Sequence, residues 1–380
     1  MPLAPAISDA PGSRIVSVAI VEVPPVPGQR TRVPAARRTV IWAVLLMLGA
    51  HLGMMLAAEH SDRLRDPPFG DKLAKLEQLQ REAGSDVPCV VVLGSSRTLL
   101  GFHGEHAEHE IEQALGTRAI AFNFGTPASG PITHLIYLKR LLAAGVRPNL
   151  LILEVLPPAL QDGIGGPVEA AIFPGDRLAS HEVPIVVQYG YDAHQTHEQQ
   201  RANAINPWAS MRDRLLARVL SSWVMEGSRL DWSRNTDAHG WTTPPRQSIT
   251  PSERAEREAK IRADFAAPLA TMEPERRPFA ALREILELCE RERIPVQLLL
   301  MPEDATFRSL YAPQVIAKLL NAMNALSAEK HVPFVNAREW LTDDDFYDGH
   351  HMFRHGALQF TSKLTSEIIV PFLREIARTR

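Results

Sequence analysis

The stretch "VVVLGSSRTLLG", residues 90–101, decides the fold. Four apolar residues lead to Gly94, two serines and Arg97 follow, and a leucine-rich run then begins. A short apolar run that stops at a glycine is typical of a buried strand. The stretch therefore predicts a strand that passes directly into a helix, with serine at the turn between them.

Similar apolar runs recur along the chain. They are nearly continuous in hydrophobicity, as in strands covered on both faces, and they occupy residues 89–94, 118–125, 149–156, 295–302 and 332–336. Helical stretches separate them, the clearest being 132–142, whose apolar stripe ends before Gly145. Alternating strands and helices predict an α/β fold with a parallel, doubly wound sheet over residues 87–378.

A long interruption separates the third and fourth runs, at about residues 157–275. It is too long for a loop, so we expect it to be a large, mostly helical insertion with its own structure. It holds Trp208, Trp223, Trp232 and Trp241. Either stacking on sugar rings or packing in a core explains these tryptophans.

Residues 39–58 contain no charged side chain and are long enough to cross the hydrocarbon layer of a bilayer. Arginines precede them and mixed charges follow, which predicts a single-pass anchor with a cytoplasmic N-terminus and an extracytoplasmic main domain. A cleaved signal peptide and a buried core helix are the alternatives. The seven prolines of residues 1–38 predict a disordered tail, and residues 59–86 are expected to form a connector helix.

Composition excludes several functional classes. A net charge of −3 without a long basic block gives no electrostatic signal for nucleic-acid binding. Two cysteines, Cys89 and Cys289, form neither a disulfide framework nor a zinc motif. His103, His106 and His109 lie among glutamates, where an exposed polar face is favoured over a metal site. We therefore expect no cofactor and no metal.

Polar residues follow the first two strands, and the site of an open α/β sheet lies beyond the carboxyl ends of its strands. Ser96 would begin a helix, whose dipole favours a developing anion, so it is a candidate nucleophile. An N-cap or a phosphate-binding turn would explain the serines as well. Asn123 and Gly125 end the second strand, where a backbone N–H could form part of an oxyanion hole; turn geometry is the alternative for the glycine.

Asp348 and His351 are three residues apart, just before a helix that begins near Gly356. This spacing allows the carboxylate to orient the ring, so that His351 acts as general base toward Ser96. His350 competes with His351 but lies only two residues from Asp348. Arg97 either binds an anionic group of a substrate or pairs with a carboxylate near the helix start.

Together these motifs resemble the SGNH (GDSL-like) hydrolase superfamily. "LGSSR" is similar to its first block, with Ser96 as nucleophile and Ser95 where aspartate is commoner. "NFGTPASG" is similar to the second, with Gly125 as oxyanion donor, and "DGHHM" to the last, with Asp348 and His351. The resemblance covers residues 86–156 and 277–378. It implies a three-layer, flavodoxin-like α/β fold.

The resemblance fails at the third block. The family usually has Gly-x-Asn-Asp after the third strand, and the asparagine completes the oxyanion hole. This chain reads "LEVLPPAL" there, with Glu154 and no asparagine. The oxyanion hole would then depend on the N–H groups of Ser96 and Gly125, with help from Asn123.

The N-terminal anchor and the "GSSR" block resemble a branch that works beside membrane-bound O-acyltransferases in polysaccharide O-acetylation. This resemblance implies an extracytoplasmic serine esterase or O-acyltransferase that acts on an acylated cell-envelope or exopolysaccharide substrate. The expected partners are the lipid bilayer, through residues 39–58, a glycan and a membrane-bound O-acyltransferase. A non-catalytic SGNH-like envelope protein that binds glycan or such a partner is the alternative.

Overall fold

The computed structural model describes residues 33–379, apart from 85, 164–165, 226–229, 231, 245–247 and 275. Most of the predicted disordered tail, residues 1–32, lies outside the described residues. The chain divides into two units, Met1–Ala50 and His51–Arg380, and the second contains the folded domain.

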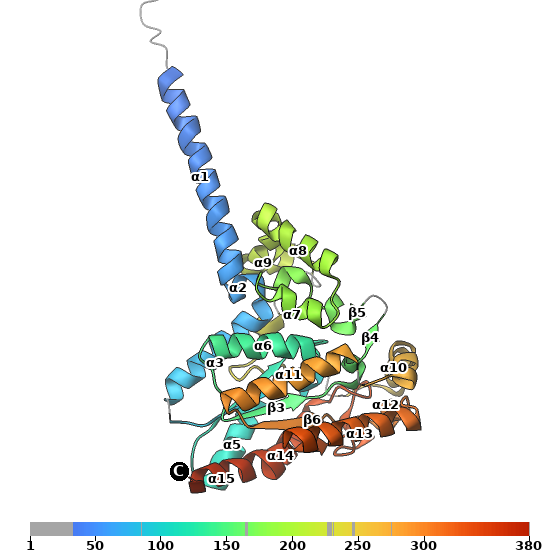
Figure 1. The fold of residues 1–380 in the computed structure, drawn as a ribbon. Helices are drawn as coiled ribbons and strands as arrows, with labels where there is room; N and C mark the ends of the chain where they lie inside the picture. The colour runs from blue at the N-terminus through green and yellow to red at the C-terminus, as the bar shows by residue number, and fades with distance from the viewer. Residues whose placement is uncertain are drawn as a thin grey trace, which may run out of the picture. The chain divides into compact units, whose positions relative to one another are not determined.

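A five-stranded parallel sheet forms the centre of the domain (Figure 1). Its strand order is β2-β1-β3-β6-β7, where the strands are β1 (Cys89–Gly94), β2 (Ile120–Gly125), β3 (Leu150–Glu154), β6 (Val296–Leu300) and β7 (Phe334–Asn336). Each of the five predicted apolar runs forms one of these strands, so the α/β fold with a parallel sheet is confirmed. Gly94 lies opposite Gly125 in the register, which brings the carboxyl ends of β1 and β2 together.

Helices cover both faces of the sheet, and alternate residues of β1 enter different hydrophobic clusters. Val91 and Leu93 pack with side chains of α3 (Pro67–Ala83), α6 (Pro131–Ala143), α11 (Arg277–Glu292) and α13 (Pro313–Lys330). Val90 and Val92 pack with those of α5 (Gly104–Leu115), α14 (Arg354–Leu364) and α15 (Val370–Thr379). Burial on both faces explains why the strands are continuously apolar.

The predicted connector is part of the domain. Most of it is α3, which follows the short α2 (Asp62–Arg65). Phe69 and Leu76 of α3 are fully buried in the main hydrophobic cluster, because these apolar positions face the domain core. Helix α3, the main part of the predicted connector, is therefore packed against the domain core and does not act as a spacer.

The described part of the insertion is mostly helical. It contains α7 (Val183–Gln188), α8 (Ala193–Ile205), α9 (Pro207–Val219), α10 (Pro251–Thr271), several 3₁₀ turns, and a two-stranded ribbon of β4 (Asp162–Gly163) and β5 (Gly166–Pro167). Trp241 is buried and donates from Nε1 to the carbonyl of Leu100, 2.8 Å away, so it is a packing residue. Trp208 and Trp223 are exposed.

The N-terminal helix α1 (Val33–His60) includes the stretch Ala36–His60, which is long and apolar enough to cross a membrane. It has 25 residues with a mean hydropathy of 2.1 and is the one such helix among the described residues. Its most hydrophobic window has no buried residues, unlike that of a core helix.

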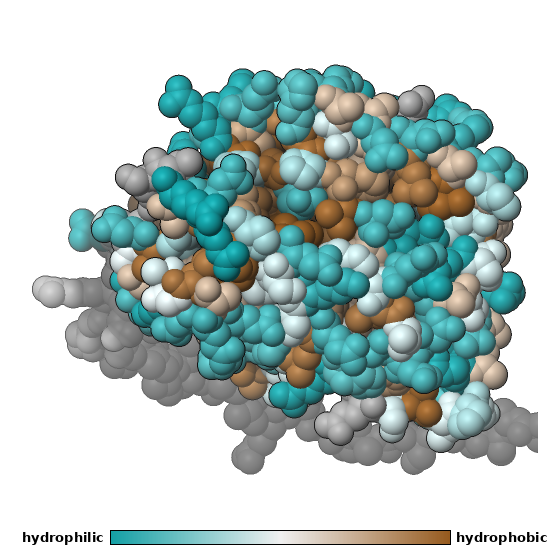
Figure 2. All heavy atoms as spheres, turned by 90° about the horizontal axis from the view of Figure 1, so that it is seen from below, coloured by the Kyte–Doolittle hydropathy of each residue, from teal (hydrophilic) through white to brown (hydrophobic). Residues whose placement is uncertain are grey.

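Figure 2 shows the face seen from below the view of Figure 1. Hydrophilic residues cover most of this face, and hydrophobic residues gather in a recess near its centre. The picture labels no residues of this recess, so the functional site is located from the side-chain contacts described below.

Candidate active site

Ser96 is the first residue of α4 (Ser96–Gly101), directly after β1. Ser95 is the N-cap, and its Oγ accepts a hydrogen bond of 3.1 Å from the N–H of Arg97. Gly94 is required before them, because a Cβ there would lie 2.1 Å from Thr98 Oγ1 and 2.4 Å from Glu154 Oε2. The Ser95 side chain is thus buried and hydrogen-bonded within the turn. Ser96 is the serine of this pair whose side chain is accessible.

Glu154 holds this turn from the end of β3. Its buried carboxylate accepts hydrogen bonds from Ser95 N and Ser95 Oγ, both 2.7 Å away, and from Thr98 Oγ1 at 2.6 Å. Sequence reasoning noted only that asparagine is missing here. A carboxylate at the end of an otherwise apolar strand was the available signal that this residue has a positioning role.

Three side chains from distant parts of the sequence meet in a hydrogen-bonded row. Ser96 Oγ lies 2.8 Å from His351 Nε2, and His351 Nδ1 lies 2.7 Å from Asp348 Oδ2. The His351 N–H also donates to Asp348 Oδ1, at 2.8 Å. Since an ionised carboxylate only accepts, Nδ1 carries the ring proton and Nε2 accepts from the serine hydroxyl.

The charge state of Asp348 suits this arrangement. Burial by itself raises the pKa of the carboxyl, but the nearby His351 and its hydrogen bond outweigh burial and hold that pKa well below its usual range. For His350, burial lowers the pKa, and the neighbouring His351 lowers it further. The His350 ring is 4.0 Å from that of His351 and 4.9 Å from that of Phe307, so it is a packed, neutral side chain.

The loop that carries Asp348 and His351 is closed at its base by an antiparallel bridge between Phe346 and Met352. At its tip, the carbonyl of Gly349 accepts a hydrogen bond of 2.9 Å from the N–H of Asp304, and Gly349 has a φ of 89°. The Tyr347 ring stacks on His351 at 5.7 Å. These contacts give the imidazole one orientation.

Arg97, predicted either to bind an anionic group of a substrate or to pair with a carboxylate, is buried and paired in the structure. Its side chain is almost fully buried, with Nη2 3.0 Å from Glu303 Oε1 and a hydrogen bond of 3.1 Å to the carbonyl of Pro302. The alternative, pairing with a carboxylate, describes the structure. Arg97 ties α4 to the segment after β6, beside Asp304, which holds the histidine loop.

The predicted oxyanion donors are also engaged elsewhere. The Gly125 N–H donates to Asn123 Oδ1 at 2.8 Å, and Asn123 Nδ2 donates to the carbonyls of Thr98, Leu99 and Phe102 at 2.8, 3.2 and 2.7 Å. Asn123 therefore satisfies carbonyls at the end of α4. Both donors predicted for the oxyanion hole are already hydrogen-bonded within the protein, which corrects that assignment. A Cβ at Gly125 would lie 2.3 Å from Leu99 N, so close packing requires this glycine.

One backbone donor remains at the turn. Ser95 N–H is bound to Glu154, and Arg97 N–H to Ser95 Oγ. Ser96 N–H is at the first helical position, where no helix carbonyl can accept it, and the described part of the chain provides no other acceptor. This N–H and the positive end of the α4 dipole are what the structure offers to an oxyanion.

Two groups of side chains have metal-compatible spacing. Asp348, His350 and His351 form one, and His103, Glu105 and Asp237 the other. The predicted surface histidines do not converge on a shared ligand position. His103 Nδ1 accepts from His106 N at 3.2 Å, His106 Nε2 lies 2.9 Å from Ser362 Oγ, and His109 Nε2 lies 2.7 Å from Gln113 Nε2.

No protein-family model and no curated protein matches the chain. Among solved structures, the chain is similar to a carbohydrate acetylesterase family member from Sinorhizobium meliloti, with 12% identity, a TM-score of 0.32, and coverage of 76% of this chain and 99% of that one. It is also similar to Est24, a carbohydrate acetylesterase from Sinorhizobium meliloti, with 12% identity, a TM-score of 0.30, and coverage of 75% and 99%. At such distances, the activity of this chain has to be argued from its own residues.

Proposed function

We propose that the protein is a membrane-anchored, extracytoplasmic serine enzyme that cleaves or transfers an acyl group by way of Ser96, His351 and Asp348. The observation that carries the proposal is the unbroken row from Ser96 Oγ through the His351 ring to Asp348, with steps of 2.8 and 2.7 Å. A nucleophile, a base and a residue that orients the base are the minimum set for this chemistry.

Ser96 Oγ attacks the carbonyl carbon of an ester while its proton moves to His351 Nε2. Asp348 stabilises the resulting imidazolium and keeps the ring in place. The Ser96 N–H and the α4 dipole stabilise the oxyanion. When the intermediate collapses, the C–O bond to the alcohol breaks, His351 returns the proton to that alcohol, and the acyl group remains on Ser96.

The acceptor of the second step decides between two activities. Water gives an esterase, and a sugar hydroxyl gives an O-acyltransferase, with the same set of residues. An acylated envelope polysaccharide as substrate follows from the sequence resemblance alone. Helix α1 supports the anchoring, because its length and composition suit one crossing of a bilayer.

A second candidate is a non-catalytic protein that keeps the fold and binds glycan or an acyltransferase. The engaged N–H of Gly125 and the amide of Asn123 favour it, as does the missing asparagine after β3. Loss of one oxyanion donor typically costs a factor of about 10²–10³ in rate. In that case Ser96, His351 and Asp348 would be correctly placed, but the catalytic rate would be low.

A fluorophosphonate probe tests the proposal, because it reacts only with an activated serine. We expect labelling of the full-length protein in detergent and no labelling of Ser96→Ala. Ser366→Ala is the matched control, since Ser366 is an exposed serine on the far C-terminal segment, and it should be labelled like the wild type. A folded wild type that takes no label and hydrolyses no p-nitrophenyl acetate would favour the binding protein.

A further inference from the structure

The stem, defined as residues 51–65, joins α1 to the domain and is bonded to the insertion. The Glu59 carboxylate accepts hydrogen bonds from Ser180 N and Ser180 Oγ, at 2.8 and 3.2 Å. Arg214 Nη1 of α9 donates to the carbonyl of Arg65 at 2.6 Å, and Arg218 donates to that of Arg63. Helix α9 thus lies against the residues that directly follow the apolar span.

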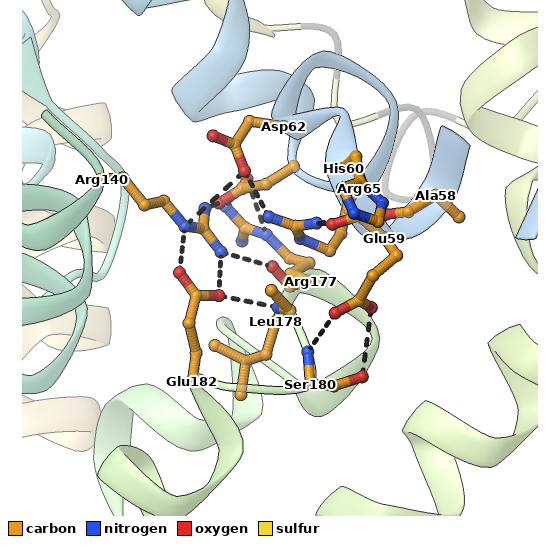
Figure 3. A network of polar contacts seen from close by, with 12 residues as sticks. Ala58, Glu59, His60, Asp62, Arg65, Arg140, Arg177, Leu178, Ser180 and Glu182 are labelled. Carbon is orange, nitrogen blue, oxygen red and sulfur yellow. Dashed lines mark hydrogen bonds and ion pairs between the residues drawn. The ribbon is translucent and has the colours of Figure 1, made fainter. Parts of the chain in front are cut away.

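A buried network of ion pairs lies next to this attachment (Figure 3). Figure 3 shows the Arg140 guanidinium reaching toward the stem on one side and Glu182 of the insertion on the other. Arg140 lies 2.7 Å from Asp66 and 2.6 Å from Glu182, and Arg177 lies 2.7 Å from Asp66. All four side chains are buried. The network therefore joins the insertion to Asp66, the residue that directly follows the stem.

Beside this attachment, the insertion presents exposed apolar side chains. They form the 219–225 surface, which consists of Val219, Leu220, Trp223 and Met225, with exposed fractions of 81%, 39%, 76% and 80%. This surface begins one residue after Arg218, which is bonded to the stem. Exposed apolar side chains that cluster in one short segment are a candidate interaction surface.

A cavity on the same part of the domain has walls of two kinds. Its volume is about 400 Å³. Leu52, Met55 and Leu56 of α1 form its apolar side, and His197, Gln200 and Arg201 of α8 are on its polar side. This combination matches the level of a bilayer where acyl chains meet headgroups, since arginine and histidine favour headgroups and leucine favours chains.

We propose that the 219–225 surface inserts into the interfacial layer of the bilayer that α1 crosses, as a second membrane contact of the domain. The occupant is phospholipid. Continuity with the span supports this choice, because Arg63 lies only three residues beyond the end of α1, a rise of about 5 Å. Tryptophan beside arginine is the composition found at such interfaces.

This inference rests on the anchoring part of the proposed function. It adds a consequence for the enzyme, because two membrane contacts set the tilt of the domain, whereas one helix alone leaves the tilt free. The active site would then meet its substrate at a fixed orientation.

The test uses the full-length chain in vesicles of phosphatidylethanolamine and phosphatidylglycerol. Trp223→Cys carries an NBD fluorophore, and Asn324→Cys on the exposed side of α13 is the matched control. Cys89 and Cys289 are buried, and wild type labelled in parallel gives the background. We expect a doxyl-labelled lipid to quench the probe at 223 several-fold more than at 324, and aqueous iodide to do the reverse.

Equal iodide quenching at both positions would overturn the inference. Protection of the probe at 223 from iodide without quenching by the doxyl lipid would also overturn it, because it would indicate a contact with protein. Val219→Cys repeats the test should Trp223→Cys fold poorly. Flotation of the unlabelled wild type reports the anchor, and p-nitrophenyl acetate turnover reports the active site. Failure of either is therefore visible separately from failure of the 219–225 surface.

Discussion

Two aspartates in this protein, the partly buried Asp348 and the fully buried Asp66, have lowered pKa values for different reasons. At Asp348 the partner is an imidazole, and at Asp66 the partners are the guanidinium groups of Arg140 and Arg177. In both cases burial raises the pKa and the partners outweigh it. The difference lies in what the partner can do next.

The imidazole has two ring nitrogens, one bonded to Asp348 and the other facing a serine hydroxyl, so it can accept a proton from that hydroxyl and return it. The guanidinium groups stay protonated under all ordinary conditions, and their donors bind Asp66, Glu182 and the carbonyl of Arg177. The cluster of Asp348 and His351 can therefore move a proton. The cluster around Asp66 only holds the start of α3, helix α6 and the insertion together. Changes at the first should affect rate, and changes at the second should affect stability.

The largest expected effect is on rate, from Ser96→Ala. Removing the nucleophile should lower kcat for p-nitrophenyl acetate by roughly 10⁴- to 10⁶-fold, because no other group can form the acyl intermediate. The thermal unfolding midpoint should stay near that of the wild type, since Ser96 is partly exposed. Residual turnover within tenfold of wild type would remove Ser96 from the mechanism.

Asp348→Asn is the next largest. Asparagine keeps the shape but no longer holds the proton on His351 Nδ1, so we expect kcat to fall by about 10⁴-fold. Fluorophosphonate labelling of Ser96 should slow in parallel. Unchanged labelling kinetics would show that Asp348, like Asp66, has only a structural part.

Asp66→Asn should give the opposite result. Two buried arginines lose a charged partner, so we expect a loss of about 3–5 kcal/mol in the free energy of unfolding. For the protein that remains folded, kcat should change little. Urea denaturation of the detergent-solubilised chain measures the first quantity, and turnover at a temperature well below unfolding measures the second. A large fall in kcat with normal stability would mean that the two clusters are coupled.

The same contrast appears in what the sequence could predict. The strands were predictable because burial on both faces makes each one a continuous apolar run. The row of Ser96, His351 and Asp348 was predictable because parallel strands end at one edge of the sheet, and because Asp348 and His351 are three positions apart in the sequence. Both signals are local in sequence and depend on backbone geometry.

The other features of the site could not be predicted, because they depend on which hydrogen-bond donors are already bonded within the folded protein. Nothing in "NFGTPASG" shows that the Gly125 N–H binds Asn123 and that Asn123 caps the end of α4. Nothing in the sequence around Arg97 showed that it would pair with Glu303, far along the chain. In the network of Asp66, Arg140, Arg177 and Glu182, the bonded pair Asp66 and Arg177 is 111 residues apart in sequence, and no common motif links the four. Such pairings follow from tertiary packing.

The smallest effect expected is the acid sensitivity of the Asp66 network. The pKa of Asp66 is lower in the folded chain than in the unfolded one, so the folded state binds fewer protons. The stability from this group is present above the unfolded value of about 3.9 and is lost as the pH falls through it toward the folded pKa. Each unit of difference between the two pKa values contributes about 1.4 kcal/mol.

Between pH 6 and pH 3, wild type should therefore lose more unfolding free energy than Asp66→Asn, whose side chain does not titrate. Glu182 remains in both proteins, so its own acid response largely cancels in the comparison. Parallel losses in the two proteins would show that Asp66 is not held as a carboxylate by its arginines.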